Sequence, residues 1–309
     1  MKYIEYVNQL LQEEVKHHSP VVLYGQNIDA GSCLSGLTKG LAEYNSGLTI
    51  NTPNSEYTLT GIGFGMMLNS VSSVFFMKQL DFLLLGVDHL VNTYNIVRQK
   101  NPEASFTIFP VVVDSGYEGP QAALNNVDDF SSLAGVDAYS FTNKVDTKLI
   151  VNEYLFKPGF RILCTGQRLL KNKTLDIDVH YNDPDFCFFH YVTGNLATIV
   201  CFNQTLDYGV KLYNFFLEKG KHASLFSVNA HHVFDFEYLL QDVNKTKKII
   251  VIDDSKSRNR LSDIFLNKVL INSNVEKMFS ISHDLNSGFF YPRNDDLNID
   301  FDFFGEQFL

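Results

Sequence analysis

The sequence predicts an α/β protein made of two doubly wound domains, in which parallel strands alternate with helices. Two observations lead to this. Short apolar runs typical of buried strands alternate with segments whose apolar residues lie at helical spacing, and this rhythm restarts after a polar stretch at 166–190. The 309 residues are enough for two domains of ordinary size. We therefore expect a first domain over residues 1–165, a linker over 166–190 and a second domain over 191–309.

Composition narrows the class of protein. The hydrophobic fraction is 45%, with 27 Phe and 15 Tyr, so a sizeable core is expected. The formal charge is −10 and the basic residues are scattered, which argues against nucleic-acid binding. The sequence contains no apolar run of about 18 residues, so we expect no membrane span. The acidic start of the chain does not resemble a signal peptide. The four cysteines lack metal or redox spacing, so we expect buried thiols in a cytoplasmic protein.

In the first domain, a helix is expected over residues 3–16, where apolar residues recur at helical spacing until Ser19-Pro20 ends it. Loop and helix are expected over 31–44, and further helices from Glu56, over 82–98 and over 144–156. Buried strands are expected at 21–25, 48–52, 73–77, 106–113, 137–141 and 160–164.

The second domain is expected to repeat the pattern. Strands are predicted at 197–202, 224–228 and 249–252, and helices at 207–219, 235–243 and 261–270. The tail from Asn286 is rich in Asn, Asp and Phe and receives no element.

One strand-to-helix junction has the residues of a ligand site. Pro53 ends the strand because its ring cannot donate to a ladder, and Asn54 or Ser55 can cap the following helix. Glu56 then falls in the first helical turn, at the edge where an open α/β sheet places its ligand crevice. Taken alone, such an acid is more simply explained as a solvated partner of the helix dipole.

The neighbouring residues change this interpretation. Thr52-Pro53-x-Ser55-Glu56, followed by Gly61-Ile62-x-x-Gly65, resembles the cofactor helix in the beta subunit of thiamine-diphosphate-dependent 2-oxo acid dehydrogenases. The resemblance implies a pyrimidine-binding first domain and a transketolase-type C-terminal domain. It implies that Glu56 hydrogen-bonds the aminopyrimidine of thiamine diphosphate. Phe82, 26 residues further on, stands where the family has an aromatic side chain against the same ring.

This cofactor reacts through a carbanion on its thiazolium ring. A carboxyl group on the far side of the aminopyrimidine helps that ring to act as a base, and burial of the carboxyl keeps a proton available by raising its pKa. Glu56 is the candidate, with Phe82 as an apolar wall that excludes water. Without the matching spacing, Phe82 is more simply a core residue.

The sequence supplies half of such a site. The family binds the diphosphate and its Mg²⁺ with a Gly-Asp-Gly motif on an alpha subunit, and this sequence contains no such motif. Gly61, Gly63 and Gly65 lie inside the expected helix, where they allow close packing. The resemblance therefore implies an alpha-type partner in an alpha-two, beta-two assembly.

The sequence departs from the family in its substrate-binding segment. Gly119-Pro120-Gln121-Ala122-Ala123-Leu124 aligns with a family segment reading Gly-Pro-x-His-Ser-Gln, so Gln121 and Ala122 take substrate-binding positions and Ala122 replaces the histidine. In the dehydrogenases this histidine assists acyl transfer to lipoyl, which alanine cannot do. Gln26 replaces an acid often found after the first strand, and residues 253–258 replace an acidic, Gly-rich turn.

We therefore expect a subunit that decarboxylates a 2-oxo acid such as pyruvate and passes the acyl unit to an aldehyde or ketone, since carboligation requires less of the protein. A dehydrogenase beta subunit that acylates lipoyl groups is the first alternative. A split transketolase is a weaker one, because phosphosugars call for a clearer set of Arg and His. A non-catalytic scaffold or regulatory subunit is the other, and Ala122 motivates it.

Overall fold

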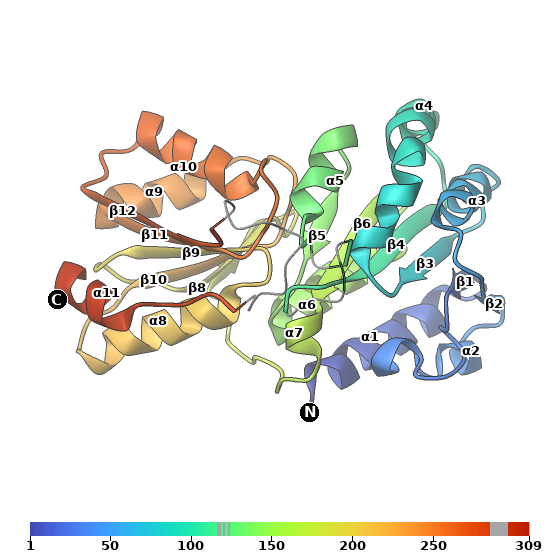
Figure 1. Cartoon of the computed structure of the whole chain (residues 1–309), viewed down its shortest axis with the longest axis horizontal. Helices are drawn as coiled ribbons and strands as arrows, with labels where there is room; N and C mark the ends of the chain where they lie inside the picture. The colour runs from blue at the N-terminus through green and yellow to red at the C-terminus, as the bar shows by residue number, and fades with distance from the viewer. Residues whose placement is uncertain (116–118, 120, 123, 285–295, 309) are drawn as a thin grey trace.

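The computed structural model describes residues 1–115, 119, 121–122, 124–284 and 296–308. Two α/β units lie side by side, each with a six-stranded sheet between layers of helices (Figure 1). The α/β fold class expected from the sequence is confirmed. No helix in the described part of the chain is long and apolar enough to cross a membrane.

The first sheet is parallel and has the strand order β2-β1-β3-β4-β6-β5. Its register brings the carboxyl ends of neighbouring strands together, since Gly25 pairs with both Asn51 and Phe76. The strands are β1 (Val22–Gly25), β2 (Leu48–Asn51), β3 (Ser73–Met77), β4 (Ser105–Val112), β5 (Ala138–Ser140) and β6 (Gly159–Gly166).

One expectation about this sheet is wrong. β2 was expected to be a buried strand, but it is the edge strand, and the side chains of Leu48 and Ile50 are 60% and 42% exposed. An edge strand has a neighbour on one side only, so an apolar sequence does not by itself bury it.

Helices cover both faces of the first sheet (Figure 1). One face is covered by α1 (Tyr3–His18), α2 (Leu41–Tyr44), α6 (Lys144–Tyr154) and α7 (Gln167–Leu170), with the short 3₁₀ turn η1 (Leu34–Gly36) in the loop before α2. The other face is covered by α3 (Glu56–Leu68), α4 (Tyr94–Val97) and α5 (Val127–Ala134).

The single long helix expected over residues 82–98 is wrong in its form. The segment consists of a 3₁₀ stretch η2 (Leu80–Gly86), a π-turn η3 (His89–Thr93), α4 and a last 3₁₀ turn η4 (Arg98–Lys100). Its first part is wound more tightly than an α-helix, and Gly86 lets it approach α3 closely.

The second sheet is mixed, with the order β12-β11-β9-β10-β8-β7. β8 runs antiparallel to both β10 and β7, whereas the pairs β9–β10, β9–β11 and β11–β12 are parallel. The strands are β7 (Tyr181–Asn182), β8 (Phe188–Val192), β9 (Thr198–Phe202), β10 (Ser224–Val228), β11 (Lys248–Asp253) and β12 (Lys277–Ser282). β7 and the start of β8 lie within residues 166–190; the domain boundaries themselves stay a prediction.

The helices of the second unit also lie on both faces of its sheet (Figure 1). α9 (Glu237–Thr246) and α10 (Leu261–Asn272) cover one face, and α8 (Leu206–Glu218) and α11 (Phe301–Phe308) the other. The largest apolar core is continuous across the two units: it joins residues of α1 and α6 to residues of α8 and α11. The two domains therefore pack as one body.

Candidate functional site

The junction that carries Glu56 lies against the carboxyl end of β1. The Thr52 N–H donates to the Gly25 carbonyl at 3.0 Å, and the Asp29 N–H donates to Asn51 Oδ1 at 2.9 Å. Gly25 has φ +150°, and a Cβ there would lie 2.1 Å from the Phe76 carbonyl oxygen. The glycine therefore permits the close approach of β1 to β3 at this end of the sheet.

Glu56 is the first residue of α3, as the sequence predicts. Ser55 occupies the N-cap position, but its hydroxyl donates to Thr58 Oγ1 at 2.9 Å rather than accepting from a backbone N–H. The Glu56 carbonyl accepts the Thr60 hydroxyl at 2.7 Å. The Glu56 side chain is half-buried, and its carboxylate has no hydrogen bond or ion pair with the residues that the structure describes.

The Phe82 segment packs directly on this first turn of α3. At Gly86, which ends η2, a Cβ would lie 2.6 Å from Thr60 Oγ1 and 3.3 Å from the Glu56 carbonyl oxygen. Phe82 is half-buried against the core beneath α3. The structure therefore brings the elements that carry Glu56 and Phe82 together, while the cofactor-binding roles of both side chains stay a prediction.

The sequence predicts that all three glycines of α3 allow close packing, but only two of them do. A Cβ at Gly61 would lie 2.7 Å from His89 Nε2, and one at Gly63 would lie 2.2 Å from Phe106 Cζ. At Gly65 nothing lies within 4 Å. The imidazole of His89 also packs against the ring of Tyr57, with 4.4 Å between the centroids.

The substrate-binding candidates are joined to the Phe82 segment through Asp81. Gln121 donates through Nε2 to the Asp81 carbonyl at 3.2 Å, and the Leu124 N–H donates to Asp81 Oδ1 at 3.3 Å. Ala122 is buried and its N–H donates to the Gly119 carbonyl. Residues 120 and 123 of this segment lie outside the described residues. The sequence analysis did not identify Asp81 as a site residue, although an acid inside an apolar run was a usable signal, and the structure buries it.

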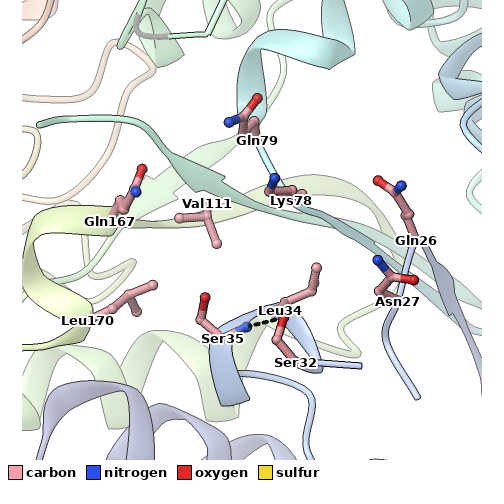
Figure 2. A pocket seen from close by; sticks show the side chains of 10 residues that line it. All are labelled: Gln26, Asn27, Ser32, Leu34, Ser35, Lys78, Gln79, Val111, Gln167 and Leu170. Atoms are coloured by element: carbon pink, nitrogen blue, oxygen red, sulfur yellow. Dashed lines mark hydrogen bonds between the residues drawn. The ribbon is translucent and has the colours of Figure 1, made fainter. Parts of the chain in front are cut away.

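A pocket of about 210 Å³ opens at the carboxyl ends of β1, β3, β4 and β6 (Figure 2). Amide side chains line it on several sides, hydroxyl groups close another side, and Lys78 supplies a positive charge. The amide residues are Gln26, Asn27, Gln79 and Gln167. Gln79 connects the pocket to the candidate site, because its carbonyl accepts the Phe82 N–H at 3.4 Å.

The second domain contacts the chain directly after the predicted substrate-binding segment. Asn125 donates through Nδ2 to the Asp254 carbonyl at 2.7 Å, and its own carbonyl accepts the Lys256 N–H at 2.9 Å. Asp128 of α5 lies 2.6 Å from Nδ1 of the buried His231. The turn at residues 253–258, which the sequence identified only as a departure from the family, is therefore part of the domain interface.

A buried ionic cluster lies at the same interface. Arg168 of α7 bonds Asp207 at 2.7 Å, and its guanidinium lies 3.7 Å from Asp114 and 3.9 Å from Asp254. Burial raises the pKa of Asp114 to about 6 and that of Asp254 to about 8. Sequence reasoning missed this cluster, because its members are far apart in the chain and meet only when the domains pack.

Comparison with known proteins finds distant relatives of the chain. No family model matches the chain. The mitochondrial pyruvate dehydrogenase E1 component subunit beta-1 of Arabidopsis thaliana is 20% identical over 263 residues, covering 80% of this chain and 70% of that protein. The 2-oxoisovalerate dehydrogenase subunit beta of Bacillus subtilis is 20% identical over 292 residues, covering 85% and 83%. The chain is a distant homologue of these beta subunits.

A solved structure has the same fold as this chain. A split-gene transketolase, described as an inactive beta4 tetramer, superposes with a TM-score of 0.64 at 13% identity, covering 92% of this chain and 90% of that one. The transketolase-like arrangement expected from the sequence is therefore confirmed.

Proposed function

We propose that this chain is the beta-type subunit of a thiamine-diphosphate-dependent enzyme that decarboxylates a 2-oxo acid such as pyruvate and transfers the acyl unit to a carbonyl acceptor. The observation that carries the proposal is the half-buried Glu56 carboxylate. It begins α3 at the carboxyl edge of the sheet, has no partner among the described residues, and lies on a turn that packs against the Phe82 segment.

These residues fit the aminopyrimidine half of the cofactor. A carboxyl group that makes no bond within the described chain is available to share a proton with a ring nitrogen, and Glu56 is such a group. Phe82, on the segment that packs against the first turn of α3, would offer an apolar surface that excludes water and restricts the plane of a bound ring. When bound, thiamine diphosphate supplies a nucleophilic carbon and a sink for the electrons released on decarboxylation. The role proposed for Glu56 is to hydrogen-bond the aminopyrimidine through its carboxyl group.

We further propose that an alpha-type partner supplies the diphosphate and Mg²⁺ half of the site in an alpha-two, beta-two assembly. The surface beside Glu56 supports this. Tyr57, next to it in α3, is 52% exposed, and Leu85 of η2 is 59% exposed. Large apolar side chains grouped at the edge of a candidate site are typical of an interface.

The proposal that the acyl unit goes to a carbonyl acceptor, and not to a lipoyl group, rests on Ala122. This residue has no group that could transfer a proton to or from a lipoyl thiol. The first alternative is a dehydrogenase beta subunit that acylates lipoyl groups, and the dehydrogenase names of its relatives favour it. A non-catalytic scaffold is the remaining alternative; the retained Glu56 and Phe82 argue against it.

The experiment combines the full chain with its alpha-type partner, thiamine diphosphate and Mg²⁺ and follows pyruvate decarboxylation. Glu56→Gln is expected to reduce the rate by about 100-fold or more, within the usual range for a group that manages a proton. Glu43→Gln is the matched control, because it removes an exposed first-turn acid from α2. Equal rates for the two variants would remove Glu56 from the mechanism. Acylation of a lipoyl domain, with no product from an added aldehyde, would establish the dehydrogenase alternative.

A further inference from the structure

We propose that the pocket lined by Gln26, Asn27, Ser35 and Lys78 binds a polyhydroxylated carbon chain that carries at most one negative charge, and that this ligand is the carbonyl acceptor. Its assignment as acceptor rests on the proposed function; its binding to the pocket does not.

The position of the pocket suits a second substrate. It lies where the carboxyl ends of four parallel strands meet, the edge at which open α/β sheets bind ligands. The loop after β1 forms one wall with Gln26 and Asn27, and Lys78 follows β3 directly (Figure 2). Through Gln79 the pocket is one hydrogen bond from the backbone of Phe82. The Glu56 junction, which follows β2, lies at the same edge of this sheet.

The lining chemistry matches hydroxyl groups. The amides of Gln26 and Asn27 each carry two donors and an acceptor, and Ser32 and Ser35 add hydroxyls that can do either (Figure 2). A hydroxyl group also donates and accepts, so a chain of hydroxyls can pair with such a wall along its whole length. Leu34, Val111 and Leu170 provide the apolar surface that the carbon backbone of such a chain can cover.

The same lining disfavours other ligands. Among the described residues that line it there is no carboxylate, so this lining does not suit a metal ion or an amine. Lys78 is the one basic side chain of the described lining, enough for a single carboxylate but not for a phosphate dianion or a diphosphate. The volume of about 210 Å³ is sufficient for a small polyol.

The test is saturation-transfer NMR on the full chain, without cofactor or partner, using glucitol, gluconate, glucitol 6-phosphate and 1-hexanol as probes. Glucitol and gluconate are expected to bind, with gluconate favoured, and the other two are not. Gln26→Leu should weaken both ligands by about tenfold, the effect of losing one or two hydrogen bonds. Lys78→Met should remove the preference for gluconate.

Gln99→Leu is the matched control, because it makes the same change at an exposed position in η4. No saturation of glucitol and gluconate, or equal binding by the Gln26 and Gln99 variants, would overturn the proposal. Tighter binding of the phosphate ester than of gluconate would also overturn it. Because the measurement contains no thiamine diphosphate, its failure is separate from a failure of the proposed catalysis, which is read from pyruvate decarboxylation.

Discussion

Two glycines two residues apart in α3 give the sharpest test of how the site is built. Gly63 and Gly65 are both interior to the helix, so replacing either by alanine gains about 0.8–1 kcal/mol of helix propensity. At Gly65 the new Cβ meets nothing within 4 Å, whereas at Gly63 it would lie 2.2 Å from Phe106 Cζ and 2.6 Å from the Tyr24 hydroxyl. Overpacking a buried position costs about 1–3 kcal/mol, and such short contacts favour the upper end.

Gly65→Ala is therefore expected to stabilise the protein by up to about 1 kcal/mol, and Gly63→Ala to destabilise it by about 2 kcal/mol. At about 2–4 °C per kcal/mol for a domain of this size, the Tm should rise by about 2–4 °C for the first and fall by about 4–8 °C for the second. Thermal unfolding followed by circular dichroism measures both. Equal shifts, or a rise for Gly63→Ala, would refute the packing of α3 against β1 and β4.

Three further outcomes follow from the domain interface and the thiols. Arg168→Met leaves buried carboxylates without their cation and should cost about 3–5 kcal/mol in denaturant unfolding at pH 8; a loss below about 1 kcal/mol would contradict the cluster. The pKa of Asp254 is about 8 in the folded protein and ~3.9 in the unfolded chain, so the stability that this carboxyl group contributes is complete below about pH 4 and is lost as pH rises through 8. Asp254→Asn should therefore flatten the fall in the denaturant midpoint of unfolding between pH 5 and 8. An unchanged slope would refute the raised pKa. Half-buried Cys33 should react with iodoacetamide in the folded protein, and mass spectrometry should find the buried thiols modified only after unfolding: Cys164, Cys187 and Cys201.

Local patterns predict the scaffold well in this chain. The alternation of apolar runs and amphipathic segments predicts the first sheet strand by strand, and Pro53 with Ser55 places the start of α3 correctly at Glu56. These features are decided by residues close together in the sequence. The motif that points to the cofactor is likewise contained within one strand-to-helix junction.

Features decided by distant neighbours were not accessible in the same way. The exposure of Leu48 follows from the place of β2 at the edge of the sheet, and strand order is not a local property. Asp81 gains its role from a loop about 40 residues further on. The Arg168 cluster joins two domains, so no single segment announces it. β7 was missed because Asn182 and its polar neighbours are typical of a loop, and the antiparallel direction of β8 is set by its pairing with the distant strand β10.

The central claim is that this chain supplies the aminopyrimidine half of a thiamine diphosphate site through Glu56. Titration calorimetry of the cofactor with Mg²⁺ tests it on the chain assembled with its alpha-type partner. We expect one cofactor per alpha–beta pair, with affinity about tenfold or more weaker after Glu56→Ala and unchanged after Glu43→Ala. An assembled pair that takes up no thiamine diphosphate, or binds it equally well without the Glu56 side chain, would contradict the claim.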